Sequence, residues 1–490
     1  MPDPRLRPDE ATRRPSDTTP TTGFVEPVGS HASVILVLCC GGLLASFLAT
    51  ALVPVAGSIG DQLGVSATSG AWALTSTFLA AAASTPIAGR AADLVGERRV
   101  LTALVLIMAA GSIISAVSDD LAPMVAGRTL QGCGAGVIPV GMSVIRRVLG
   151  PERMATGAST MSVAVGLGGG AGLPLAAWVI EDFGLSMLFW GAGCVALLLG
   201  VAFRVALAPD ASRPRESFDA IGAVGVVVLL LCGLIPVAQG ARWGWTSPPV
   251  LGLLGAGALT AVIWVPYELR RRWPLVDIRA ARMPVIVVAN LCSALVGVMY
   301  MLGTLTASHL LQTSAVPPFS GMGQSTLTAG VLLTPGGLSM LVSTPLAARL
   351  IRLTNVSATL MAAAVVAGTG FVLLLLWHAA AWQVSAAMTV VSAGVGMAMT
   401  ATPVMISSST AAGRMAAAQA LNVVARFGGT AVASALVVAV LDAFGDGPVP
   451  GVPAESAYCA LFTIGTALAV VICGLAACTR RWTGKGFITT

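Results

Sequence analysis

The chain has 490 residues, of which 56% are hydrophobic and only 10% are charged. This composition excludes a set of soluble domains and indicates a protein of the lipid bilayer. A net charge of +6 would suggest nucleic-acid binding in a soluble protein, but in a membrane protein the positions of the charges matter more than their sum. We therefore expect the bilayer, and no nucleic acid, as a partner.

Residues 1–30 are rich in Pro, Thr, Asp and Arg, and we expect them to form a disordered cytoplasmic tail rather than a signal peptide. Beyond this tail, apolar stretches of about 20 residues recur, each long enough to cross the hydrocarbon core as a helix. Charged, Pro-rich and Gly-rich breaks predict fourteen spans, near residues 33–55, 70–89, 100–117, 122–145, 156–180, 185–207, 220–239, 250–267, 284–311, 326–350, 357–378, 382–406, 415–441 and 456–478.

Lys and Arg collect in alternate loops between these spans, as the positive-inside rule requires. Loops of the other parity carry acids instead, such as Asp119, Asp120, Glu181 and Asp182. Because the number of spans is even, we expect a multi-pass protein of the cell membrane with both termini in the cytoplasm.

An internal repeat relates the two ends of the chain. The segment Ser84–Arg90 recurs about 260 residues later as Ser343–Arg349, and Arg153–Ala155 recurs as Arg414–Ala416. We therefore expect an N-terminal six-helix half at 31–208, two linker helices with their loops at 209–283, a C-terminal six-helix half at 284–479 and a cytoplasmic tail at 480–490. Parallel six-helix repeats around a midplane cavity are typical of alternating-access transporters.

Two motifs carry a family resemblance. Arg128 to Gly136 fit the pattern R-x-x-Q-G-x-G-x-G, and the pattern G-x-x-x-D-x-x-G-x-[RK]-[RK] is matched by Gly89, Arg90, Asp93, Gly96, Arg98 and Arg99. The segments Trp72–Thr75, Pro274–Asp277 and Leu421–Gly429 are also similar to the same family. The chain thus resembles a major facilitator superfamily transporter of the fourteen-span drug:proton antiporter type, which implies an all-α polytopic fold with 14 transmembrane helices.

The chain also departs from that family. Its fifth span keeps Gly168 and Gly172 of the antiporter signature, but Leu173 stands at the proline position and Pro174 follows one residue late. Relatives commonly carry an Asp in the first span, where this chain has Leu48. The proton site that the resemblance implies is therefore missing. We expect the glycine run and Pro174 to allow close helix packing or bending.

The Gly89–Arg99 segment is expected to form a charged loop at the cytoplasmic surface. The resemblance implies that its six motif residues latch the two halves together when the cavity faces outward, with the thirteenth span near Arg414 as the partner. The alternative is a tight turn that only fixes topology. Gly89 and Gly96 suit either role.

Arg128 and Arg426 lie inside predicted spans, where each arginine costs about 2.5 to 3.5 kcal/mol on insertion scales. Both are therefore expected to face the protein interior or a watery cavity. In the alternative, the guanidinium holds backbone carbonyls at a helix break. Further candidates for the cavity or for proton coupling are Gln131, Asn290, His309 and Asn422, although hydrogen bonds between helices, or a position at the membrane interface for His309, explain them as well.

None of the 21 acids lies deep inside a predicted span, so we expect a neutral to positive cavity. The first hypothesis is a secondary active exporter of small amphipathic compounds, such as a drug or a specialised metabolite, by proton-coupled antiport. The alternative is an exporter or facilitator of an anionic metabolite or lipid without the usual carboxylate proton site. We expect a monomer without cofactor or metal, driven by the proton gradient. A membrane enzyme or sensor is the rival class, but no catalytic constellation supports it.

Overall fold

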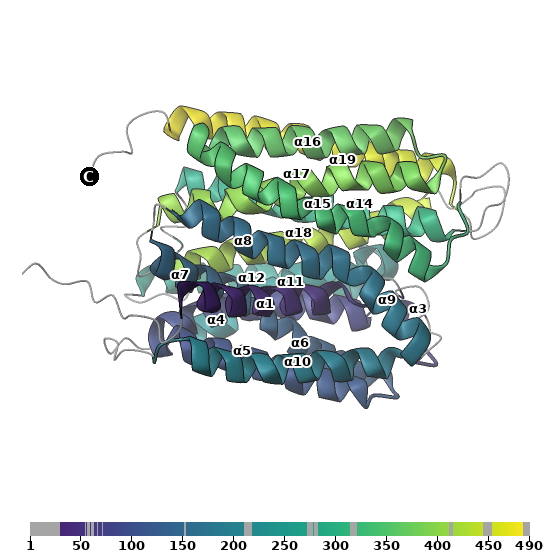
Figure 1. Ribbon diagram of the computed structural model, residues 1–490. Helices are drawn as coiled ribbons and strands as arrows, with labels where there is room; N and C mark the ends of the chain where they lie inside the picture. Colours follow the sequence, from purple (N-terminus) through teal and green to yellow (C-terminus); the bar gives the residue numbers. More distant parts are fainter. Residues whose placement is uncertain are drawn as a thin grey trace, which may run out of the picture.

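The computed structural model describes residues 30–53, 55, 59, 63–65, 67–70, 72–150, 153–209, 218–271, 278, 283–313, 321–410, 415–443 and 453–483. All regular elements within these ranges are helices, which confirms the predicted all-α class. The long helices lie side by side with their axes roughly aligned (Figure 1).

The first six predicted spans form the N-terminal half, and two of them are interrupted. Its elements are α1 (His31–Thr50), the short α3 (Ala67–Gly70), α4 (Trp72–Val95), α5 (Glu97–Ala116), α6 (Leu121–Cys133), η1 (Gly134–Gly136), α7 (Val137–Leu149), α8 (Met154–Gly166), η3 (Leu167–Ala171), α9 (Gly172–Phe183) and α10 (Leu185–Ala206). The fourth span contains a 3-10 turn at η1, and the fifth contains a π-helical turn at η3. Turns of the π type inside α-helices frequently mark functional sites.

The remaining spans comprise two inserted helices and the C-terminal half. They are α11 (Ala220–Trp243) and α12 (Pro248–Arg270), followed by α14 (Pro284–Gln312), α15 (Thr326–Leu353), α16 (Val356–Leu376), α17 (Ala381–Ser408), α18 (Met415–Ala443) and α19 (Glu455–Thr483). In Figure 1 the helices α14 to α17 and α19 occupy the upper part of the bundle, and α1, α5, α6 and α10 the lower part.

Within the described residues, thirteen helices are long and apolar enough to cross a membrane when each interrupted span is counted once. Helix α4, at the second predicted span, is not among them because Ser and Thr residues recur along it. The predicted fourteen spans are matched only if α4 is added. The outer surface is apolar as a bilayer requires, with Val262 and Val342 each 72% exposed.

Two seams join the halves. Helix α4 packs against α18, and the α8–η3–α9 span packs against α15. The inserted helix α11 lies against both α4 and α18, with the Trp72 and Trp243 ring centroids 6.4 Å apart. Helix α11 therefore covers the first seam from outside the twelve-helix core, and α12 packs on α11.

The two ends of the bundle differ. At the basic end, which is on the left in Figure 1, α4, α7, α15 and α17 finish and α5, α8 and α18 begin. Two bonds join the halves there: Arg146 Nη1 donates to the Thr410 carbonyl over 3.4 Å, and Arg352 Nη1 to the Thr156 hydroxyl over 3.2 Å. At the opposite end, the Leu327 amide donates to Glu181 over 3.2 Å.

Candidate functional site

A central cavity lies between the halves, with about 650 Å³ of empty space that includes open solvent. Its walls come from α1, α4, α7 and α8 of one half and from α14, α15, α17 and α18 of the other. The lining is mostly apolar, with the sulfurs of Met301, Met340 and Met399 and the rings of Phe78 and Phe427, whose centroids lie 6.2 Å apart. Secondary transporters bind substrate at such an interface between repeats.

A second cavity of about 350 Å³ adjoins the first toward the basic end, where Pro403 and Gln419 line it. The two cavities share Ile138, Val165, Met399 and Arg426. Neither cavity has an Asp or a Glu in its described lining, which agrees with the neutral to positive cavity expected from the sequence.

Arg426 stands where the two cavities meet. Within the described part of the chain, its guanidinium has no hydrogen-bond or ion-pair partner. Arg426 packs closely against Gly297 of α14. A Cβ at Gly297 would clash with the Arg426 carbonyl oxygen and come within 3.2 Å of the Arg426 Cγ. This close approach of α14 to α18 fixes the stem of the arginine, which lines both cavities.

Arg128 has a different role. It is fully buried, its Nε donates to the Ala73 carbonyl over 3.0 Å, and its Nη1 donates to the Leu48 carbonyl over 2.8 Å and to Gln131 Oε1 over 2.7 Å. Its guanidinium also lies 5.9 Å from the Phe189 ring centroid. Arg128 lines neither cavity, so the geometry favours the alternative in which it holds backbone carbonyls, here of α1 and α4.

The other polar candidates mostly join helices. Gln131 donates to Ser112 over 3.1 Å, and Asn422 donates to Asn290 over 3.3 Å. His309 Nδ1 lies 2.9 Å from the Tyr458 hydroxyl at the opposite end of the bundle. Of these four candidates Asn422 alone lines one of the two described cavities, the second one, while its amide remains engaged with α14.

The glycine run of the fifth span has two packing faces. A Cβ at Gly168 would clash with the Leu43 carbonyl of α1, and one at Gly172 would come within 2.6 Å of the Phe47 ring. Gly166 and Gly170 lie on the other face of the run, toward α15. A Cβ at Gly166 would clash with the Met340 side chain, and a Cβ at Gly170 would come within 2.7 Å of the Gly337 Cα. The run therefore packs against its own half on one face and against the partner half on the other. The Pro174 backbone continues the second contact toward Gly330.

The prediction that Gly89–Arg99 forms a charged loop is wrong. Gly89, Arg90 and Asp93 lie in the last turns of α4, and Arg98 and Arg99 lie in the first turn of α5. The connection is Gly96 alone, whose φ of 108° lies in the region that favours glycine. Arg98 donates to the Arg204 carbonyl and Arg99 to the Val95 carbonyl.

The predicted partner of the latch is the start of the thirteenth span, which is helix α18, but Arg414 itself lies outside the described residues. The same holds for the Pro274–Asp277 segment of the family resemblance. Phe78 and Phe427 fix the register of the antiparallel helices α4 and α18. A latch between the Asp93 segment of α4 and α18 across this seam stays a prediction.

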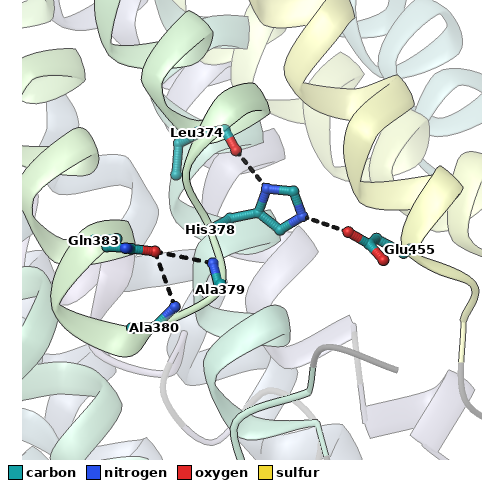
Figure 2. A network of polar contacts seen from close by, with 6 residues as sticks. All are labelled: Leu374, His378, Ala379, Ala380, Gln383 and Glu455. Atoms are coloured by element: carbon teal, nitrogen blue, oxygen red, sulfur yellow. Dashed lines mark hydrogen bonds and ion pairs between the residues drawn. The ribbon is translucent and has the colours of Figure 1, made fainter. Parts of the chain in front are cut away.

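Sequence reasoning missed two polar clusters. Glu97, buried at the start of α5, forms an ion pair with Arg147 and accepts a hydrogen bond from Ser143 over 2.9 Å. At the opposite end of the bundle, His378 lies between the Leu374 carbonyl, 2.8 Å from Nδ1, and Glu455, 3.1 Å from Nε2 (Figure 2). Glu97 occupies an unspecified position of the Gly89–Arg99 motif, and His378 belongs to no motif; the ion-pair partner of each is distant in the chain.

The His378 cluster joins three helices of the C-terminal half. Both atoms that face the imidazole accept hydrogen bonds, so a ring with protons on both nitrogens satisfies both. Gln383 of α17 accepts from the amides of Ala379 and Ala380 in the same turn (Figure 2). The cluster thus ties the end of α16 and the start of α17 to the start of α19.

The sequence matches the model of the Major Facilitator Superfamily over residues 38–434. Among curated proteins, the chain is 25% identical over 328 residues to the uncharacterized MFS-type transporter YhcA of Bacillus subtilis, which is 66% of this chain and 60% of that protein. It is 28% identical over 284 residues to the multidrug resistance protein B homolog of Mycobacterium tuberculosis, covering 56% of this chain and 51% of that protein.

The cephamycin export protein CmcT of Amycolatopsis lactamdurans is 31% identical over 326 residues, 64% of each chain. The chain therefore spans 51 to 64% of the length of these three relatives. The solved structure of the human organic anion transporter MFSD10 shares the fold, with a TM-score of 0.67 and 17% identity over 91% of this chain and 99% of that one. The chain belongs to the major facilitator superfamily and has the many apolar helices of a multi-pass membrane protein.

Proposed function

We propose that the chain is a secondary active exporter that moves a small amphipathic compound, a drug or a specialised metabolite, across the cell membrane by alternating access. In this proposal the basic end faces the cytoplasm, as the positive-inside rule requires, and the proton gradient supplies the energy. The observation that carries it is the central cavity, which is lined by both halves and whose mostly apolar wall includes three Met and two Phe side chains.

Two further findings support export of an amphipathic compound. The adaptable thioethers of three methionines suit apolar ligands of varied shape. In addition, several relatives bear the names of multidrug or antibiotic exporters, including a multidrug transporter of Bacillus subtilis and a probable actinorhodin transporter of Streptomyces coelicolor.

A second candidate function follows from the charge of the site: export of an anionic metabolite or lipid without proton exchange. Arg426 lines both cavities, and no described acid does. Moving one negative charge out of a cell with a negative interior is favoured by about 2.3 kcal/mol per 100 mV of membrane potential. An anion exporter of this kind needs no cavity carboxylate.

Flux in proteoliposomes separates the two candidates. Vesicles containing the purified chain are given either a pH gradient at zero potential or a potassium diffusion potential at equal pH, and the efflux of a fluorescent amphiphile is followed. Proton antiport predicts that the pH gradient drives efflux. Efflux that is driven by the potential but not by the pH gradient contradicts antiport and supports the second candidate. Efflux no faster than that of protein-free vesicles under both conditions contradicts both candidates.

A further inference from the structure

The Ser and Thr hydroxyl groups that line the central cavity, from helices α1 and α18, are already engaged. Ser46 donates to the Val165 carbonyl over 2.7 Å, Thr50 to the Gly169 carbonyl over 3.1 Å, and Thr430 to the Phe427 carbonyl over 2.7 Å. Their protons are therefore directed at backbone oxygens rather than into the cavity. Any ligand in the cavity must find its hydrogen-bond donors elsewhere.

Two donors remain: the Arg426 guanidinium and the Tyr300 hydroxyl. Both line the central cavity, and neither has a hydrogen-bond partner within the described residues. The Tyr300 hydroxyl faces the π-helical turn of the other half, since a Cβ built on Gly169 would lie 3.3 Å from its oxygen. Tyrosine and arginine in a largely apolar cavity are costly unless a ligand completes their hydrogen bonds.

Helix geometry brings the two donors close to each other. Gly297 of α14 touches the stem of Arg426, and Tyr300 follows Gly297 by three residues, which places it one helical turn along the same face. The pair therefore presents a charged donor and a neutral donor from neighbouring helices. Phe78 and Phe427 supply ring surfaces to the same cavity.

We propose that Arg426 and Tyr300 together bind the acidic head group of an amphipathic carboxylate, whose ring-containing body lies against Phe78 and Phe427. The inference rests on the proposed exporter function and names its substrate class. A carboxylate offers acceptors to both donors and neutralises the arginine. A cationic amphiphile would meet a like charge in a cavity whose described lining contains no acid, and a neutral amide would leave the arginine uncompensated.

The test compares three probes with one naphthalene ring and different charge: 2-naphthoate, 2-naphthamide and 2-naphthylmethylammonium. Binding to the full chain in lipid nanodiscs is measured by calorimetry, with empty nanodiscs as the background. We expect 2-naphthoate to bind most tightly. Arg426→Gln should weaken its binding about ten- to hundred-fold, and Tyr300→Phe about three- to ten-fold, because each removes a hydrogen bond to a charged group.

Tyr458→Phe is the matched control, since it removes a tyrosine hydroxyl that bonds to His309 away from both cavities. It should leave the affinity for 2-naphthoate unchanged. If Arg426→Gln does not fold, Tyr300→Phe decides the matter alone. Equal affinity for the three probes, unchanged affinity in Tyr300→Phe, or no binding of 2-naphthoate overturns the proposal. Binding needs no gradient, so these results leave export itself to the flux assay.

Discussion

Replacing Gly170 by alanine tests the backbone contact across the second seam between the halves. A Cβ at this position would lie 2.7 Å from the Gly337 Cα and 3.2 Å from the Gly337 nitrogen. Carbon atoms in contact prefer a separation of about 3.5 to 4.0 Å, so η3 and α15 must move apart by about 1 Å. Both neighbours are backbone atoms, so no side-chain rotation can relieve the clash.

Overpacking of this kind costs about 1 to 3 kcal/mol. If the clash arises only when the cavity faces one side of the membrane, this cost shifts the equilibrium between the inward-facing and outward-facing states by about 5- to 150-fold. Alanine also gains about 1 kcal/mol of helix propensity over glycine, which opposes the clash. Gly191→Ala gives that gain without the clash, because nothing lies within 4 Å of a Cβ at Gly191 in α10.

The measurement is thermal unfolding of the purified variants, together with hydrogen exchange of the α15 and α8–α9 amides. Gly170→Ala should unfold at a lower temperature than Gly191→Ala and exchange faster along the seam. Equal unfolding temperatures and equal exchange in the two variants would refute the close packing of η3 on α15.

Four further substitutions test structural roles. Arg128→Gln should destabilise the fold by several kcal/mol, because a shorter side chain leaves the buried Leu48 and Ala73 carbonyls without their donor at about 1 to 3 kcal/mol each; near-normal unfolding would contradict this. Gly96→Ala should cost about 1 to 3 kcal/mol from its positive φ, seen in the same unfolding assay, and no loss would show that the α4–α5 connection differs. His378→Phe should lower the unfolding temperature and speed amide hydrogen exchange at the start of α19. Glu455→Gln should have a smaller effect because it keeps a hydrogen-bond acceptor for His378. Equal amide protection in the wild type and in His378→Phe would rule out the His378–Glu455 contact as a link between α16 and α19.

The spans themselves could be predicted from the sequence because each is a long apolar run between charged or Gly-rich breaks. The span predicted at 284–311 is helix α14, Pro284–Gln312. The exception is instructive. The Gly89–Arg99 charges suggested a loop, yet α4 and α5 simply continue beyond the apolar stretch, and one glycine makes the connection. Charge density marks where a helix leaves the hydrocarbon, not where the helix ends.

The site was less predictable because its chemistry depends on contacts between distant residues. Arg128 and Arg426 are equivalent as sequence signals, but one is surrounded by carbonyls of α1 and α4 and the other faces a cavity. Tyr300 lies in an apolar stretch and belongs to no motif. Its importance follows from the packing of α14 on α18 at Gly297, which no local pattern reveals.

Counterflow in proteoliposomes tests most directly the central claim that substrate crosses through the cavity at Arg426. Vesicles loaded with unlabelled 2-naphthoate are diluted into a trace of the labelled compound, so that exchange through the carrier concentrates the label without any imposed gradient. The account predicts transient accumulation with the wild-type chain and with Tyr458→Phe, and its loss in Arg426→Gln protein that is shown to be folded. Accumulation by folded Arg426→Gln equal to that of the wild type would contradict the account.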